Sequence, residues 1–185
     1  MESLRRLFIA VDVPEQIKTE IQAIQRGLRK QKLFTGRYTA PESIHITLQF
    51  VGEVERFVAT NIQERLQYLS MPVRTAKLGS VDVFSTGQKI NIIFVHVIAP
   101  QLVKLAREIN YNLRDIVKAE TRPFIPHLTI ARVKSVQDRQ KLLHYVNAIQ
   151  LEKLEWQVFY FVLKESILHQ DGVTHTDVQK YMLKN

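Results

Sequence analysis

The sequence predicts an α+β protein built from two similar lobes. Two observations carry this prediction: segments with strand-like and helix-like hydrophobic spacing alternate along the chain, and the order strand, helix, strand, helix occurs twice. Residue identity between the halves is weak, so the duplication is visible only in the order of the elements. We expect a single two-lobed domain over residues 1–185, in which each lobe has an antiparallel sheet with flanking helices and the lobes enclose a cleft.

The first half opens with a strand and a helix. Residues 6–13 form an apolar run typical of a buried strand, and Pro14 stands where a helix begins. The next strand, 44–51, alternates cleanly, and a second amphipathic helix follows Gly52. The alternation places on one face Ile44, Ile46, Leu48 and Phe50, and on the other His45, Thr47 and Gln49. The helices are recognised by apolar residues at helical spacing, which are Ile17, Ile21, Ile24 and Leu28, and then Val54, Phe57, Val58, Ile62, Leu66 and Leu69.

The second half repeats this order. Its predicted elements are strands over 90–98 and 125–133, helices over 100–117 and 136–149, and further strands over 73–84, 154–168 and 173–183. In this arrangement His45 and His127 occupy equivalent points of the two halves.

The composition is that of a basic globular protein. Hydrophobic residues make up 45% and charged residues 24%, and Lys and Arg outnumber Asp and Glu by 26 to 18, a net charge of +8. The cations are scattered, which fits a small phosphorylated substrate or an RNA end better than a long DNA track; a merely solvated basic surface is the alternative. The chain has no cysteine, and no apolar run reaches the roughly 18 residues of a membrane span. We therefore expect a cytoplasmic protein without disulfides, thiolate metal sites or thiol catalysis.

A repeated tetrapeptide is the most informative signal. His45-Ile46-Thr47-Leu48 in the first half matches His127-Leu128-Thr129-Ile130 in the second. Two such matches are expected by chance in roughly a few of a thousand sequences of this composition. Positions two apart in a strand share a face, so each histidine points the same way as its threonine. If the lobes pack by pseudo-symmetry, both pairs line one cleft.

Two opposed imidazoles suit displacement at phosphorus. One removes a proton from the attacking water and the other protonates the departing oxygen, while the threonine hydroxyls donate to the non-bridging oxygens. Which histidine is the base stays open. A structural histidine is the alternative for either one alone, and a loose metal site at His169 and His175, beside a turn at Asp171-Gly172, is another. With no cysteine and no His-x-x-x-His pair, we expect no metal and no cofactor; His96 and His144 are expected on the surface, with no role.

Three segments, RLFIAVDVPE, PESIHITLQFVGEV and FIPHLTIARVK, resemble the two-histidine phosphoesterase superfamily. The resemblance is closest to its bacterial and archaeal RNA 2′,3′-cyclic phosphodiesterases, also described as 2′-5′ RNA ligases, and extends to a C-terminal ESILHQDGVTH segment similar to the family's last hairpin. It implies a bilobal fold with the active site between the lobes. It also implies metal-independent hydrolysis of RNA 2′,3′-cyclic phosphate ends to 2′-phosphomonoesters.

The resemblance assigns roles to five residues. His45, Thr47, His127 and Thr129 match the family's catalytic positions, with the histidines as the proton carriers and the threonines on the phosphate. Arg132 matches an arginine that the family places near the phosphate. Strict alternation puts Arg132 on the face opposite His127, so a bulge, a twist or side-chain reach must bring it round; otherwise it is a surface cation. The family's common tryptophans are replaced by Tyr38 and Phe94, which, with Phe84, either stack on a base or belong to the core.

Alternative functions share these residues. The same pairs fit a 2′-5′ oligonucleotide or cyclic-nucleotide phosphodiesterase, a 2′-5′ RNA ligase, or a non-catalytic RNA-end-binding module. The expected partners are RNA ends or small cyclic-phosphate nucleotides, with no membrane and no obligate protein partner, and the expected state is a monomer.

Overall fold

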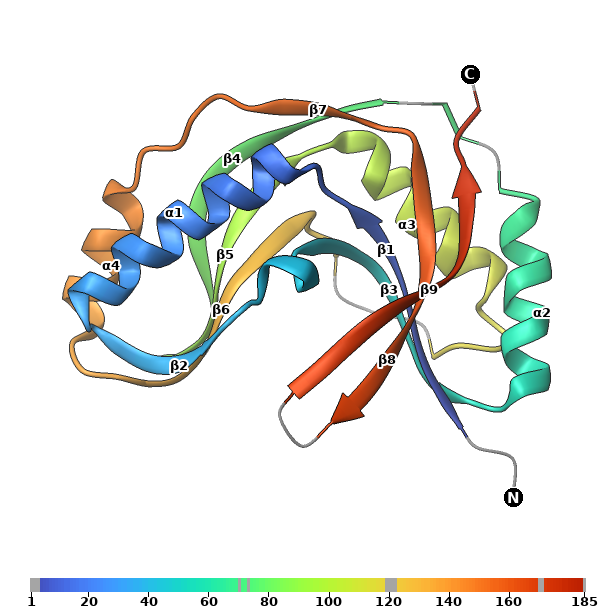
Figure 1. Ribbon diagram of the computed structural model, residues 1–185, viewed down its shortest axis with the longest axis horizontal. Helices are drawn as coiled ribbons and strands as arrows, with labels where there is room; N and C mark the ends of the chain where they lie inside the picture. Colours follow the sequence, from blue (N-terminus) through green and yellow to red (C-terminus); the bar gives the residue numbers. More distant parts are fainter. Residues whose placement is uncertain (1–3, 70, 73, 119–122, 170–171, 185) are drawn as a thin grey trace.

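Two antiparallel sheets lie side by side with helices on their outer sides (Figure 1). The computed structural model describes residues 4–69, 71–72, 74–118, 123–169 and 172–184. Within them the chain forms, in order, β1 (Arg5–Asp12), α1 (Glu15–Gln31), β2 (Phe34–Tyr38), a 3₁₀ turn (Pro41–Ser43), β3 (His45–Val54), α2 (Arg56–Gln67), β4 (Arg74–Thr86), β5 (Lys89–Ile98), α3 (Pro100–Asn112), β6 (His127–Val136), α4 (Arg139–Ala148), β7 (Glu155–Val158), β8 (Tyr160–His169) and β9 (Gly172–Met182). The predicted α+β class is confirmed.

Three neighbouring strands of one sheet correspond to three neighbouring strands of the other. The first has the order β3-β1-β8-β9 and the second β2-β6-β5-β4-β7, so β3, β1 and β8 take the places that β6, β5 and β4 take in the other. Every pairing is antiparallel. The first His-x-Thr unit lies at the start of β3 and the second at the start of β6, which is the equivalence that the sequence predicted.

Each sheet is covered by one helix from its own half and one from the other half. α1 follows β1 but packs against β6, and α3 follows β5 but packs against β3. The other two helices pack within their own halves, α2 against β1 and α4 against β4 (Figure 1). Buried Gln25 on α1 adds a polar link, because its side-chain amide donates to the backbone carbonyls of Thr39 and Ile130. The helices therefore tie the two sheets into one core.

The burial pattern follows the apolar periodicity of the sequence. In β1, Leu7 to Val11 are all buried, as expected of a strand in the middle of a sheet. In α1 the buried stripe includes Ile17, Ile21, Ile24 and Leu28. Burying one such side chain is worth about 1.5–3 kcal/mol, so this single stripe is a major source of the helix's stability.

A β-bulge follows each His-x-Thr unit. Gln49 and Thr47 of β3 pair with two neighbouring residues of β1, so Leu48 between them has no partner and is the extra residue of β3. Ala131 and Thr129 of β6 likewise pair with two neighbouring residues of β5, so Ile130 is the extra residue of β6. An extra residue shifts the alternation by one, so side chains beyond it change face.

Several predicted boundaries were wrong. The strand over 154–168 is interrupted at exposed Phe159, where the chain passes from one sheet to the other as β7 and β8. Val54 and Val136, assigned to helices, are the last residues of β3 and β6, and the helix over 100–117 ends at Asn112. The strand β2 was not predicted at all. Val73, the start of the strand over 73–84, lies outside the described residues.

Candidate active site

The two His-x-Thr units lie on the sheet faces that point away from the core. Ile46 and Leu128, the residues between each histidine and threonine, have no exposed surface, whereas His45, Thr47, His127 and Thr129 are half-buried. Neighbours in a strand point to opposite faces, so both polar pairs project from the side opposite the packed helices. The predicted orientation of all four side chains is therefore observed.

Each imidazole is anchored in the same way. The Nδ1 atom of His127 lies 2.7 Å from the carbonyl oxygen of Ile125, two residues earlier. His45 makes the matching hydrogen bond to the backbone of Ser43, also two residues earlier. Because Nδ1 of the neutral His127 ring donates to a carbonyl, the lone pair of that ring lies on Nε2 and is available to a substrate.

Aromatic rings flank both imidazoles. The ring centroid of His45 lies 5.0 Å from that of Phe8, and the centroid of His127 lies 4.9 Å from that of Phe84 and 5.4 Å from that of Phe94. Phe94 is only 1% exposed, so it belongs to the wall under His127 and is not free to stack on a base. Phe84 is half-buried and meets His127 edge-on.

This environment favours the neutral form of both histidines. Burial is the main cause that lowers the pKa of His45 to about 3, with contributions from His175, Lys164 and Arg132, against the opposing hydrogen bond to Ser43. Burial also lowers the pKa of His127, and the charges of His96 and Arg132 act in the same direction. The site without substrate is therefore a pair of neutral bases at neutral pH.

Arg132 is brought to the site by the bulge at Ile130. Beyond the bulge Ala131 and Val133 are buried and Arg132 is exposed, so Arg132 shares the face of His127. The Arg132 charge is the smallest of the causes that lower the pKa of His45 and of His127. Of the routes considered from the sequence, the bulge is the one that the structure uses.

Phe50 changes face for the same reason, which contradicts the sequence prediction. It was placed on the core face with Ile44 and Ile46, but beyond the bulge at Leu48 its side chain is 67% exposed. It pairs with Phe8, whose ring centroid is 6.5 Å away, and so lies on the face of His45. Phe50 is an exposed aromatic ring beside the site, at the position equivalent to Arg132.

Sequence reasoning also missed a polar cluster contributed by the last two strands. Lys164 on β8 is only 8% exposed, and its Nζ atom lies 2.6 Å from Oδ1 of Asp177 and 3.0 Å from Oδ1 of Asp12. His175 on β9 contacts the ring of His45, with 5.4 Å between centroids. A lysine directly after the apolar run FVL was the available signal for a buried ion pair.

The remaining residues considered from the sequence lie apart from one another. His169 and His175 occupy opposite faces of the β8–β9 hairpin, since Ser166 pairs with His175 and His169 is three residues beyond Ser166. Asp171 of the proposed turn lies outside the described residues, and the residues described contain no group of three potential ligands that could hold a metal ion. Tyr38 packs against the core with the Arg29 guanidinium 4.1 Å from its ring centre, and His144 is exposed on α4.

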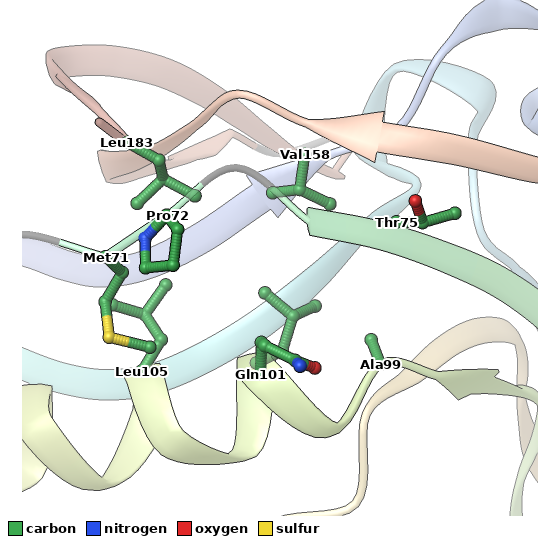
Figure 2. Close-up of a pocket in the computed structure, with 9 residues that line it drawn as sticks. Met71, Pro72, Thr75, Ala99, Gln101, Leu105, Val158 and Leu183 are labelled. Carbon is green, nitrogen blue, oxygen red and sulfur yellow. The ribbon is translucent and has the colours of Figure 1, made fainter. Parts of the chain in front are cut away.

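Two pockets elsewhere do not provide an alternative site. One lies between α3 and the chain segments around Met71, Val158 and Leu183, and its free volume of about 10 Å³ suffices for one water molecule (Figure 2). A larger groove of about 320 Å³ separates α1 from α4. It carries the carboxylate of Glu20 and has no lysine or arginine in its lining, so it is poorly suited to a phosphate.

The chain is similar to known phosphoesterases over nearly its whole length. A family model described as LigT like Phosphoesterase matches residues 11–94 and 93–175. A protein of Methanocaldococcus jannaschii named RNA 2′,3′-cyclic phosphodiesterase is 28% identical over 178 residues, which are 95% of this chain and 99% of the relative. A crystal structure of a Thermus thermophilus protein has a TM-score of 0.79 at 26% identity and covers 97% of this chain and 98% of its own.

A structure of E. coli LigT in complex with 3′-AMP shares the fold. Its TM-score is 0.74 at 19% identity, and both chains are covered completely. Among the residues described, none of the helices combines the length and the apolar character that a membrane crossing requires.

Proposed function

Because this chain belongs to the LigT-like phosphoesterase family, and is therefore an enzyme that cleaves phosphate esters, we propose that it hydrolyses 2′,3′-cyclic phosphate ends of RNA. The curated relatives that carry the name RNA 2′,3′-cyclic phosphodiesterase align over nearly the full length of the chain, which supports this substrate. The observation that carries the proposal is the pair of equivalent His-x-Thr units at the starts of β3 and β6, with Arg132 on the same face as His127.

The reaction follows from the roles that these side chains can take. One neutral imidazole accepts a proton from water while the water oxygen bonds to phosphorus, and the opposite imidazolium donates a proton to the ribose oxygen as its bond to phosphorus breaks. The hydroxyls of Thr47 and Thr129 and the guanidinium of Arg132 donate to the two non-bridging oxygens, where negative charge builds up. A bound phosphate anion stabilises a positive charge nearby and so favours the single imidazolium that the reaction needs. Protonation of both rings stays unfavourable, because burial and neighbouring cations lower both pKa values.

We infer the leaving oxygen from the resemblance to the family and not from the site. The two His-x-Thr units are equivalent, so they do not themselves choose between the 2′ and the 3′ oxygen. By its resemblance to the family, the 3′ oxygen leaves and the product is a 2′-phosphomonoester. Phosphorus NMR of the product from a 2′,3′-cyclic dinucleotide tests this, and a predominant 3′-phosphate would refute it.

The two histidines are tested by substitution with glutamine. We expect His45→Gln and His127→Gln each to reduce hydrolysis of a fluorescent cyclic-phosphate oligonucleotide by about 100- to 10,000-fold, because each removes one proton carrier. The double variant should be little worse than either single one, since the two groups act as a unit. His144→Gln, on the exposed face of α4, is the matched control and should keep full activity. Tight binding of the oligonucleotide by the wild-type protein without turnover would favour an RNA-end-binding module instead.

We also propose that the reaction needs no metal ion and that the protein acts as a monomer of one two-lobed domain. Two imidazoles, two hydroxyls and one guanidinium supply every proton and charge that the reaction requires. Activity should persist unchanged in EDTA. A loss that one particular divalent ion restores would contradict this mechanism.

A further inference from the structure

A third histidine belongs to the immediate surroundings of His45. The ring of His175 meets the ring of His45 at an interplanar angle of 85°, with 5.4 Å between centroids. Phe8, which is 3% exposed, contacts both rings at centroid distances of 5.0 and 4.9 Å. Together with the hydrogen bond to Ser43, these contacts give the His45 imidazole three neighbours that restrict its orientation.

His175 is itself held in place by the β8–β9 hairpin. Its Nδ1 atom lies 3.3 Å from Oγ of Ser166, its cross-strand partner. The next pair on the same face is Lys164 and Asp177, and Lys164 also binds Asp12 on β1, the strand that pairs with β3. The hairpin is therefore fastened by buried charge to the strand beside His45.

We propose that His175 is a positioning residue for His45, so that the C-terminal hairpin completes the phosphoesterase site. The edge contact fixes the orientation of the His45 ring and excludes water from one side of it. This inference rests on the proposed function for its effect on turnover, but the contact between the two rings can be tested without substrate.

The charges around the two rings define the effect of removing His175. Lys164 on β8 and Arg132 on β6 are the cations that act on His45, and Asp12 on β1 and Asp177 on β9 are bound to Lys164. In the acid pH range where His45 takes up a proton, a protonated His175 opposes that uptake. Substituting His175 removes this opposition and admits water, and both changes raise the pKa of His45. The lysine and its two carboxylates remain in the variant.

The test is an NMR titration of the His45 imidazole together with steady-state kinetics. In His175→Ala we expect the pKa of His45 to move upward towards its ordinary value. We expect kcat to fall about 10- to 100-fold with KM changed less than about twofold, because a misoriented ring affects the reacting geometry more than binding. His175→Phe keeps a ring at this position and should restore most of kcat.

The matched control lies on the same hairpin. The side chain of His169 is hydrogen-bonded to Thr174 on the face of the hairpin opposite His175. His169→Ala should therefore change neither the His45 titration nor the rate of hydrolysis. His175→Gln, which can keep the bond to Ser166 but lacks the ring, replaces the alanine variant if that variant does not fold.

An unchanged His45 titration and a kcat within twofold of wild type in a folded His175→Ala or His175→Gln variant would overturn the proposal. A clear shift of the His45 titration in a protein that does not hydrolyse cyclic phosphates would support the positioning role and refute the proposed substrate.

Discussion

Among single residues, His45 has a proposed role as a proton carrier and also affects the stability of the fold. Burial above all lowers its pKa in the folded protein to about 3, from an ordinary value of 6.5. Between these pH values the unfolded chain binds a proton that the folded chain does not, so stability is complete above pH 6.5 and declines as the pH falls. Burial also lowers the pKa of His127, so His127 adds to the loss of stability at low pH.

We therefore expect the free energy of unfolding to fall by about 1.4 kcal/mol per pH unit from His45 alone as the pH drops below 6.5. Urea denaturation at pH 7 and pH 5 measures the decline. It should be shallower in His45→Gln, which has no group that titrates at this position. Equal slopes in the two proteins would show that His45 is not buried in the neutral form.

The threonine hydroxyls make a second prediction at this scale. Thr47→Val and Thr129→Val preserve shape but remove one donor to the phosphate, and each should slow turnover by about 100- to 1,000-fold without abolishing it. Thr60→Val serves as the control, because the Thr60 hydroxyl bonds the Arg56 carbonyl on the surface of α2. Wild-type rates for both site variants would make the hydroxyls structural.

The alternation of apolar and polar residues correctly predicted which way four site side chains point. It failed for the residues just beyond them in the same strands. His45, Thr47, His127 and Thr129 precede the bulges, so the period of two applies to them. Phe50 and Arg132 follow the bulges, and neither Leu48 nor Ile130 is a residue type that marks an inserted position. His175 was missed because its contact with His45 joins strands that are far apart in the sequence.

At the scale of elements, β2 shows why one strand escaped prediction. Its sequence, FTGRY, is short and contains a central glycine, which is unfavourable in a strand. The structure supplies the reason for that glycine: a Cβ atom on Gly36 would collide with the carbonyl oxygen of Arg132 and lie 3.1 Å from Cα of Val133. The close approach of β2 to β6 therefore depends on Gly36.

Gly36→Ala should destabilise the protein by about 1–3 kcal/mol, because the collision involves backbone atoms that move only with the strand. It should also lower activity, since Arg132 is displaced. Gly27→Ala is the comparison: its Cβ would lie 2.8 Å from the Tyr145 hydroxyl, the end of a flexible side chain, and alanine is favoured in a helix by about 1 kcal/mol. Urea denaturation of both variants checks the contrast, and a Gly36→Ala protein as stable as wild type would contradict it.

At the scale of the whole molecule, the exchange of α1 and α3 makes the two sheets interdependent. Neither sheet is covered by helices of its own half alone. We expect one cooperative unfolding transition, with Trp156 fluorescence, which reports on β7 in one sheet, and far-UV circular dichroism, which reports on all elements, giving the same midpoint. Two separate midpoints would mean that the lobes unfold as independent units.

The place of β1 between β3 and β8 also bears on how the chain folds as it is made. β3 follows β1 closely, but Arg5 of β1 meets Glu165 of β8, 160 positions later. A ribosome adding about 5–20 residues per second needs roughly ten to thirty seconds for that interval. Throughout it, the apolar run of β1 has an open edge, which is the kind of edge that pairs with other chains. The nascent chain should therefore depend on chaperones until its last hairpin emerges.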